Sequence, residues 1–260
     1  MQFYDLLAEY YDLLFPPEPA VCAFLRDRFQ NSSHLVDVGG GTGSYALALG
    51  RDGFRVTVLE PSAAMAERAQ RKIAALADQE RRRLRVLTAG FEQINALCSS
   101  PVQGVYCIGN TLAHLTESNA IRVAIRETAS LLPPGGVVLI QVLNFDRIPY
   151  AEHFELPTLT GTGGQVSATM RRRYLPASDP AFVRFAVELE IRSSAAEVAG
   201  EDGRLLEREW HETLLRRIPS AALRTTLEEE GFNLSACYGG FERAAFDPER
   251  SFVLIVDAVR

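Results

Sequence analysis

Short apolar runs alternate with longer segments of helical periodicity over residues 34–143. Runs that have the length and composition of buried strands cover residues 34–38, 55–59, 84–87, 104–108 and 136–142. Helical stripes separate them, such as Met65, Ala69 and Ile73 after an N-capping Ser62. A further helix is expected at 116–132. This alternation predicts βαβ units and therefore an open, doubly wound α/β sheet.

The periodicity changes to two after residue 144. Alternating segments at 166–174, 182–192 and 205–218 predict three antiparallel strands. A helix is expected at 220–230, followed by two closing strands at 232–238 and 252–259. We therefore predict a Rossmann-like, seven-stranded sheet with an antiparallel β insertion after the fifth strand. Such an insertion would overhang the carboxyl edge of the sheet, where open α/β folds bind ligands.

The patterning predicts one domain over residues 1–260 with four regions. These are an N-terminal helical cap at 1–33, a ligand-binding core at 34–144, a β-rich lid at 145–218, and a closing helix with two strands at 219–260. The chain has no linker-like Gly/Ser tract between them.

Composition narrows the classes of partner. A net charge of −6 argues against nucleic acid binding, and no apolar run approaches the roughly 20 residues that span a bilayer. No basic residue precedes Arg26, so we expect no signal peptide and a cytoplasmic protein. The cysteines are scattered without a C-x-x-C pair, so no metal site is expected. A homodimer stays open.

A glycine-rich turn joins the first predicted strand to its helix. Backbone N–H groups there face the crevice, as in anion and nucleotide sites. Gly39, Gly41 and Gly43 follow a G-x-G-x-G spacing, and Ser44 stands where a dinucleotide motif has its third glycine. The spacing therefore argues against a pyrophosphate ligand.

Two carboxylates flank this turn. Asp37 lies just before the glycines, where its charge would repel phosphate but suit an ammonium or sulfonium group. Glu60 stands at the end of the second strand, seventeen residues after Gly43, and can accept hydrogen bonds from ribose hydroxyls. Together they predict a nucleoside ligand that carries a positive charge.

Two features together resemble the first two motifs of class I S-adenosylmethionine-dependent methyltransferases: the run Leu35-Val-Asp-Val-Gly-Gly-Gly-Thr-Gly43, and Glu60 after the second strand. The resemblance implies S-adenosyl-L-methionine as cofactor, with the glycine turn against its methionine moiety and Glu60 on its ribose. Thr42 has a second reading, as the cap of the first core helix. The implied cofactor-binding residues are Tyr11, Asp37, Gly39, Gly40, Gly41, Thr42, Gly43, Glu60, Pro61, Met65, Gly90, Phe91, Ile108, Gly109 and Asn110.

Further segments resemble one branch of that family, the glycine and sarcosine N-methyltransferases and the amino-sugar N-methyltransferases. Gly109-Asn-Thr-Leu-Ala-His-Leu115 is similar to a run that follows the fourth strand of the glycine N-methyltransferases. Amino-sugar enzymes likewise place a histidine there, at His114. Tyr11-Asp12 matches a pair that closes over the cofactor in many small-molecule methyltransferases.

Two positions depart from the family pattern. Ala89-Gly-Phe91 replaces an aspartate that often binds the adenine amino group, so backbone and apolar groups would have to contact adenine. Leu143 replaces the arginine that holds the carboxylate of glycine. Glycine is therefore not the expected acceptor.

The candidate catalytic base is His114, because an amine acceptor must lose a proton before its lone pair can attack. Its alternative reading is a helix-start histidine bonded to backbone. His211 beside Trp210, Asn144 and Tyr150 are candidate substrate contacts. The alternatives are a solvent-facing strand residue for His211 and loop structure for the other two. We expect His34 and His153 to lie at the surface or at a strand edge.

The run Arg171-Arg-Arg173 reads as a solvated strand face, unless the strand alternation turns one arginine inward to meet an anionic substrate. The favoured function is a small-molecule methyltransferase acting on an amine nitrogen. The alternatives are an NAD(P)-binding Rossmann oxidoreductase, a non-catalytic protein that binds S-adenosylmethionine, and an RNA methyltransferase. The acidic composition counts against the last.

Overall fold

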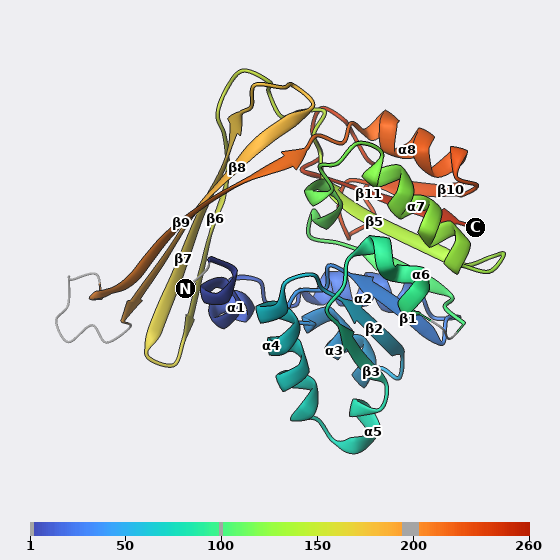
Figure 1. Ribbon diagram of the computed structural model, residues 1–260, viewed down its shortest axis with the longest axis horizontal. Helices are drawn as coiled ribbons and strands as arrows, with labels where there is room; N and C mark the ends of the chain where they lie inside the picture. Colours follow the sequence, from blue (N-terminus) through green and yellow to red (C-terminus); the bar gives the residue numbers. More distant parts are fainter. Residues whose placement is uncertain (1–2, 99–100, 194–202) are drawn as a thin grey trace. The chain divides into compact units, whose positions relative to one another are not determined.

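A computed structural model describes residues 3–98, 101–193 and 203–260 (Figure 1). The chain divides into two compact units. The first, which we call the β unit, comprises residues 1–16 and 149–217. The second, the core unit, comprises residues 17–148 and 218–260.

The core unit is built on the predicted seven-stranded sheet, with strand order β10-β11-β5-β4-β1-β2-β3. Strands β1 to β5 pair in parallel, β11 runs antiparallel to β5, and β10 antiparallel to β11. This confirms the predicted Rossmann-like fold. The strands are β1 (His34–Val38), β2 (Arg55–Leu59), β3 (Leu84–Leu87), β4 (Gly104–Cys107), β5 (Val137–Leu143), β10 (Asn233–Tyr238) and β11 (Val253–Val259).

Helices cover this sheet. A main apolar cluster joins α2, α3 and α4 to the central strands, and Phe29, Leu49 and Tyr106 are fully buried within it. Helix α7 packs against α6 and α8. Ser62 caps α4 as predicted, since its side chain accepts a hydrogen bond from Met65 N. The helices are α2 (Pro19–Arg28), α3 (Ser44–Arg51), α4 (Ala63–Ala74), α5 (Asp78–Arg81), α6 (Ile94–Leu97), α7 (Ala120–Leu131) and α8 (Ser220–Glu229), with 3-10 turns η1 (Phe91–Gln93) and η2 (Thr111–His114).

His34 begins β1, at the end of the strand, but it does not lie at the surface, because the neighbouring strands β2 and β4 enclose β1. Its side chain is buried, with Nε2 at 2.9 Å from Thr57 Oγ1 and Nδ1 at 3.2 Å from the carbonyl oxygen of Pro101. Burial lowers the pKa of the imidazole. His34 is therefore a core histidine whose ring nitrogens both bind neighbouring groups.

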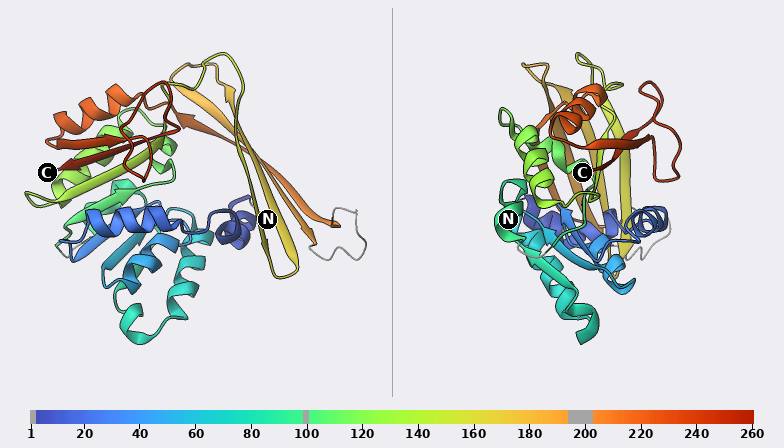
Figure 2. Two further views of the ribbon diagram at one scale, coloured as in Figure 1. Left: turned by 180° about the vertical axis from the view of Figure 1, so that it is seen from behind. Right: turned by 90° about the vertical axis from the view of Figure 1, so that its right-hand side faces the viewer.

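The β unit holds a four-stranded antiparallel sheet and helix α1 (Phe3–Leu14), visible from two sides in Figure 2. Its strands pair in the order in which they occur along the chain. Helix α1 contacts β6, β7 and β9, so the N-terminal segment expected as a single cap at 1–33 is divided between the units. The strands are β6 (Phe154–Gly163), β7 (Val166–Pro176), β8 (Phe182–Ser193) and β9 (Leu205–Arg216).

Strand β6 was not expected, since we predicted three inserted strands. Pro157 interrupts its pattern, and the ladder with β7 shifts register between Leu156 and Leu159. Proline is tolerated there because β6 is an edge strand. Gly161 leaves no apolar signal, but it is required: a Cβ there would lie 2.1 Å from the carbonyl oxygen of Leu13 on α1.

None of the helices within the described residues is long and apolar enough to cross a membrane.

Candidate functional site

The carboxyl ends of β1, β2 and β4 meet at one edge of the sheet, because these strands are parallel neighbours. The glycine turn follows β1, and its Gly39, Gly41 and Gly43 have φ angles of 70°, 56° and 75°. These left-handed angles strongly favour glycine. A Cβ on Gly39 would also lie 2.2 Å from Thr111 Cγ2, so the turn after β1 lies directly against the turn after β4.

The N-terminus of α3 differs from the sequence expectation for Thr42. Gly43, and not Thr42, occupies the N-cap position, and no side chain caps the helix. Thr42 is fully buried instead, and Lys72 Nζ donates to Thr42 Oγ1 at 3.2 Å and to Ser44 Oγ at 2.9 Å. Lys72 therefore braces the helix start from α4, a contact that the sequence did not indicate.

Glu60 holds the turn in place from the end of β2. One carboxylate oxygen, Oε2, accepts a hydrogen bond from Gly41 N at 2.9 Å, and Oε1 accepts one from Ser62 N at 2.8 Å. The residue is 8% exposed, and burial raises its pKa against the opposing effect of these two bonds. Each oxygen has a second lone pair, so the fixed carboxylate retains acceptor capacity for a ligand.

Asp37 is enclosed within the sheet just before the turn. It is 2% exposed, and burial raises its pKa from 3.8 to about 7, with a further rise from the charge of Glu60 and an opposing effect of the Tyr106 hydroxyl. Tyr106 stands opposite Asp37 on β4, yet Asp37 Oδ2 and Tyr106 Oη each lack a partner with hydrogen-bond geometry. A buried carboxylate oxygen without a donor is the kind of group that a nearby positive charge would stabilise.

The turn after β4 forms the third part of the edge. Gly109 and Asn110 both have left-handed backbone, with φ of 78° and 67°. Gly109 N donates to Gln141 Oε1 at 2.6 Å, and Asn110 Oδ1 accepts from Leu143 N at 3.0 Å. Gln141, buried on β5, is a supporting residue that the sequence analysis missed; one amide within an otherwise apolar strand was the available signal.

The remaining residues expected at the cofactor lie around this edge. Met65, Phe91 and Ile108 are buried, Gly90 is partly exposed, and Pro61 is exposed beside Glu60. The segment that departs from the family pattern is tied to the site, since Ala89 N donates to the carbonyl oxygen of Glu60 at 3.2 Å. His114, the candidate base, ends η2 with an exposed side chain.

Asn144 follows β5 in the core unit but uses its side chain within the fold. Its amide nitrogen donates to the carbonyl oxygens of Pro248 and Ser251, both at 2.9 Å, and its Oδ1 accepts from Asp146 N at 3.1 Å. The residue is 2% exposed. The structure therefore shows the loop-structure reading of Asn144.

The other predicted contacts belong to the β unit. Tyr11 stacks on Phe15 with 4.7 Å between ring centroids. Tyr150 is exposed and carries the Arg217 guanidinium 4.3 Å from its ring centroid. His211 is half-buried, and its ring meets that of Tyr4 edge to face.

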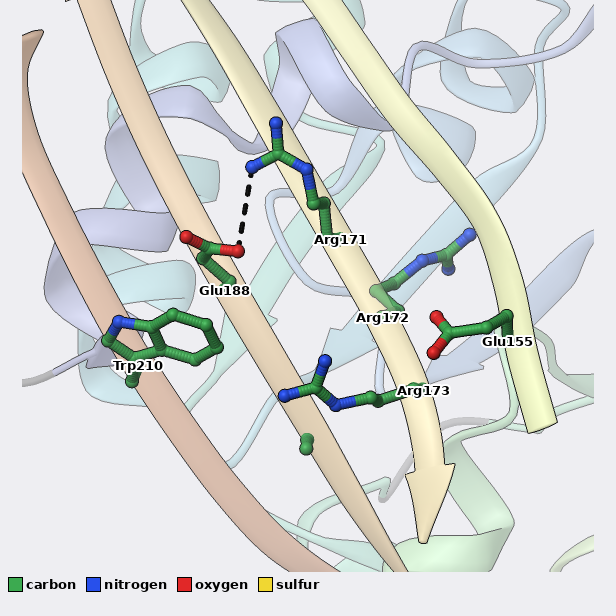
Figure 3. A pocket seen from close by; sticks show the side chains of 7 residues that line it. Glu155, Arg171, Arg172, Arg173, Glu188 and Trp210 are labelled. Atoms are coloured by element: carbon green, nitrogen blue, oxygen red, sulfur yellow. Dashed lines mark hydrogen bonds and ion pairs between the residues drawn. The ribbon is translucent and has the colours of Figure 1, made fainter. Parts of the chain in front are cut away.

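A small pocket lies in the β unit, over β7 and its neighbours (Figure 3). Arg171 Nη1 lies 3.5 Å from Glu188 Oε2, and the Arg173 guanidinium lies 5.9 Å from the centroid of the Trp210 ring. The pocket is thus lined largely by charged groups of both signs and one exposed indole.

The core unit therefore has the architecture of a nucleoside-binding α/β protein. Its glycine turn leaves no room for a Cβ at Gly39 or Gly40, the fixed Glu60 carboxylate can accept ribose hydroxyls, and Asp37 lies buried before the turn. These residues fit an adenosyl group linked to a sulfonium better than a diphosphate.

Comparison with known proteins shows which families this chain resembles. Residues 35–136 match the methyltransferase domain family. A curated relative, the glycine/sarcosine N-methyltransferase of Parasynechococcus marenigrum (strain WH8102), is 29% identical over 114 residues, which cover 44% of this chain and 39% of the relative. A putative methyltransferase of Geobacillus sp. (strain WCH70) is 24% identical over 221 residues, or 82% of this chain and 81% of the relative.

Solved structures share the fold along almost the whole chain. The CcbJ methyltransferase from Streptomyces caelestis aligns with a TM-score of 0.74 at 20% identity, over 97% of this chain and 95% of that one. CalS10, an amino pentose methyltransferase from Micromonospora echinaspora with S-adenosylmethionine bound, aligns with a TM-score of 0.69 at 16% identity, over 100% of this chain and 98% of that one. The sugar N-methyltransferase KedS8 from Streptoalloteichus sp. ATCC 53650 aligns with a TM-score of 0.69 at 19% identity, over 100% of this chain and 93% of that one.

The matched residues 35–136, the fold and the site are thus similar to those of class I S-adenosylmethionine-dependent methyltransferases.

Proposed function

We propose that this protein transfers the methyl group of S-adenosylmethionine to an amine nitrogen of a small molecule. The observation that carries the proposal is the description of its relatives: the curated relative is a glycine/sarcosine N-methyltransferase, and KedS8 is a sugar N-methyltransferase. The turn after β4 supports it, because Gly109 and Asn110 adopt left-handed backbone immediately before the 3-10 turn that ends at His114.

The chain's own residues would bind and orient the two reactants. Gly39, Gly41 and Gly43 offer close backbone approach to the cofactor, and the fixed Glu60 carboxylate accepts its ribose hydroxyls. Bound S-adenosylmethionine supplies an electrophilic methyl group whose leaving group is a neutral thioether. Alignment of the acceptor nitrogen with that methyl then provides most of the rate enhancement, and no covalent nucleophile on the protein is needed.

His114 has the role of proton acceptor in this proposal. An ammonium acceptor has no lone pair, so an imidazole nitrogen of His114 removes a proton first. The freed pair forms the new N–C bond as the S–C bond breaks. We also propose that the inserted sheet of the β unit, with Tyr11, Tyr150 and His211, supplies the acceptor contacts. Glycine is not the expected acceptor, because Leu143 stands where the resemblance implies the arginine that holds the carboxylate of glycine.

The test is methyl transfer to a panel of amines, amino sugars and matched hydroxyl compounds, with methyl-labelled donor and mass detection of the product. We expect a mass gain on amines and little on their hydroxyl analogues. Product formed on oxygen alone would contradict nitrogen as the acceptor atom. Tight binding of S-adenosylhomocysteine by calorimetry, without transfer to any compound of the panel, would favour a non-catalytic binding protein.

A further inference from the structure

The three consecutive arginines of β7 do not share one face of the sheet. Because side chains alternate along a strand, Arg171 and Arg173 project from one face and Arg172 from the other. Figure 3 shows Arg171 and Arg173 extending toward β8 and Arg172 extending toward β6. Arg171 pairs with Glu188 and Glu190 at 3.5 and 3.7 Å. Arg172 therefore differs from its neighbours in direction and in contacts, although all three arginines line the small pocket of Figure 3.

Arg172 lies on the face that α1 covers, among apolar and aromatic groups. Leu156 and Val187, which stand opposite it on β6 and β8, are buried, and its guanidinium carbon lies 5.8 Å from the centroid of the Phe15 ring. Burial lowers the pKa of Arg172, against an opposing effect of the Tyr174 and Tyr11 phenols.

The hydrogen bonds of Arg172 leave part of its charge uncompensated. One terminal nitrogen, Nη2, donates to the carbonyl oxygen of Pro157 at 2.9 Å. Its Nε is buried without an acceptor, and no carboxylate in the described part of the chain forms an ion pair with it. Arg172 is only partly buried, but its Nε is enclosed, and a charged donor held away from water without an acceptor is costly, so an anionic ligand would stabilise it. The Pro157 bond fixes the side-chain direction and occupies only Nη2 of the guanidinium.

A second polar group lies in the same row of the sheet. Arg172 pairs with Val187, and Val187 pairs with His211 on β9, so all three side chains lie on one face. Helix α1 contributes an aromatic ring at each end, with Phe15 near Arg172 and Tyr4 against His211. Burial lowers the pKa of His211, which disfavours the charged form of the imidazole.

We infer that Arg172 is an anion-binding residue of the β unit, and that it takes the oxyanion of the methyl acceptor, a carboxylate or a phosphate. The planar fork of a guanidinium matches both groups. This inference rests on the proposed function for the statement that the anion belongs to the methyl acceptor, but the anion site itself does not depend on methyl transfer. It adds to that function a substrate class: amines that carry a negative group.

The first experiment tests the anion site without catalysis. Inorganic phosphate and acetate are titrated separately into the full chain without cofactor, with thermal shift and calorimetry as readouts, for wild type, Arg172→Gln and Arg173→Gln. Arg173 is the matched control, because it is the next residue on the same strand, projects from the other face and has no carboxylate partner among the described residues. We expect R172Q to weaken binding of the preferred anion about tenfold or more and R173Q to leave it within about twofold.

The second experiment tests the substrate class. Amines matched in size but bearing a carboxylate, a phosphate monoester or a neutral amide are compared by KM and kcat. We expect R172Q to raise KM about tenfold or more for one anionic arm, with kcat and the neutral arm little changed. The arm affected identifies the anion as carboxylate or phosphate. If R172Q does not fold, R172K replaces it: it keeps the charge but loses the fork, and we expect an intermediate rise in KM.

The outcomes separate the two ideas. Equal effects of R172Q and R173Q on anion binding and on KM would overturn the anion site and leave amine methylation standing. Phosphate or acetate binding that depends on Arg172, without methylation of any amine, would support the anion site and refute the proposed function.

Discussion

The buried carboxyl group of Asp37 should make the stability of this fold depend on pH. The proposed perturbation is Asp37→Asn, which keeps nearly the same side-chain volume and removes the ionisation. Because burial raises the Asp37 pKa to about 7 in the folded chain, the protonated form is the one that the fold favours. The unfolded chain releases that proton near pH 3.8, the ordinary value.

The sign of the effect follows from proton counts. Between pH 3.8 and about 7 the folded chain holds one more proton than the unfolded chain, so the free energy of unfolding falls as pH rises through that interval. At 1.36 kcal/mol per pH unit, the difference between the two pKa values amounts to about 4 kcal/mol. The protonated Asp37 carboxyl therefore makes its full contribution to the free energy of unfolding below pH 4 and loses it above pH 7. The variant does not lose it, because the asparagine side chain does not ionise.

The assay is denaturant unfolding of wild type and D37N without cofactor, at intervals from pH 5 to pH 8. We expect the stability advantage of D37N to grow with pH, toward about 4 kcal/mol at pH 8. Asp78→Asn is the control for the loss of a carboxylate as such, because Asp78 is exposed on α5. Parallel curves for D37N and wild type would show that Asp37 is ionised in the fold at no cost, and would refute the reasoning.

Three further predictions concern the edge of the sheet. Glu60→Ala should weaken S-adenosylhomocysteine binding by about 1 to 3 kcal/mol, since it leaves ribose hydroxyls and Gly41 N without an acceptor; unchanged calorimetric affinity would contradict the assigned role. Gly39→Ala should destabilise the fold by about 1 to 2 kcal/mol from its left-handed φ alone, and more from the clash with Thr111, as read from thermal unfolding. His114→Ala should slow amine methylation by about a hundredfold or more while cofactor affinity stays the same; wild-type turnover would leave His114 a structural residue.

Elements defined by local patterns could be predicted from the sequence, and those defined by distant contacts could not. The seven core strands follow from apolar runs of strand length, and the Ser62 cap follows from its place before a helical stripe. Strand β6 carries no such pattern. Its Gly161 is required because the backbone of α1, about 150 residues earlier in the chain, lies against it. The local sequence pattern around Gly161 does not indicate that contact.

The same distinction holds for the candidate site. The spacing of Gly39, Gly41 and Gly43 identified the three positions that the structure places in left-handed backbone. The partners of Glu60 were not predictable, because its hydrogen bond to Gly41 N depends on the parallel register of β1 and β2. The burial of His34 was not predictable for a similar reason: it depends on Thr57 and Pro101, which lie on neighbouring segments of the chain.

Strand alternation and pairing partners together decide what a charged run means. The sequence predicts a solvated run at Arg171, Arg172 and Arg173 in which the strand alternation could turn one arginine inward, but it does not say which one. The period of two separates Arg172 from its neighbours, and the carboxylates of β8 then pair with Arg171 on the opposite face. Arg172 is left with a backbone carbonyl and aromatic rings. A charge that the fold leaves unpaired at the cost of desolvation is a better indicator of a ligand than the charge density of the run, which pointed equally to all three residues.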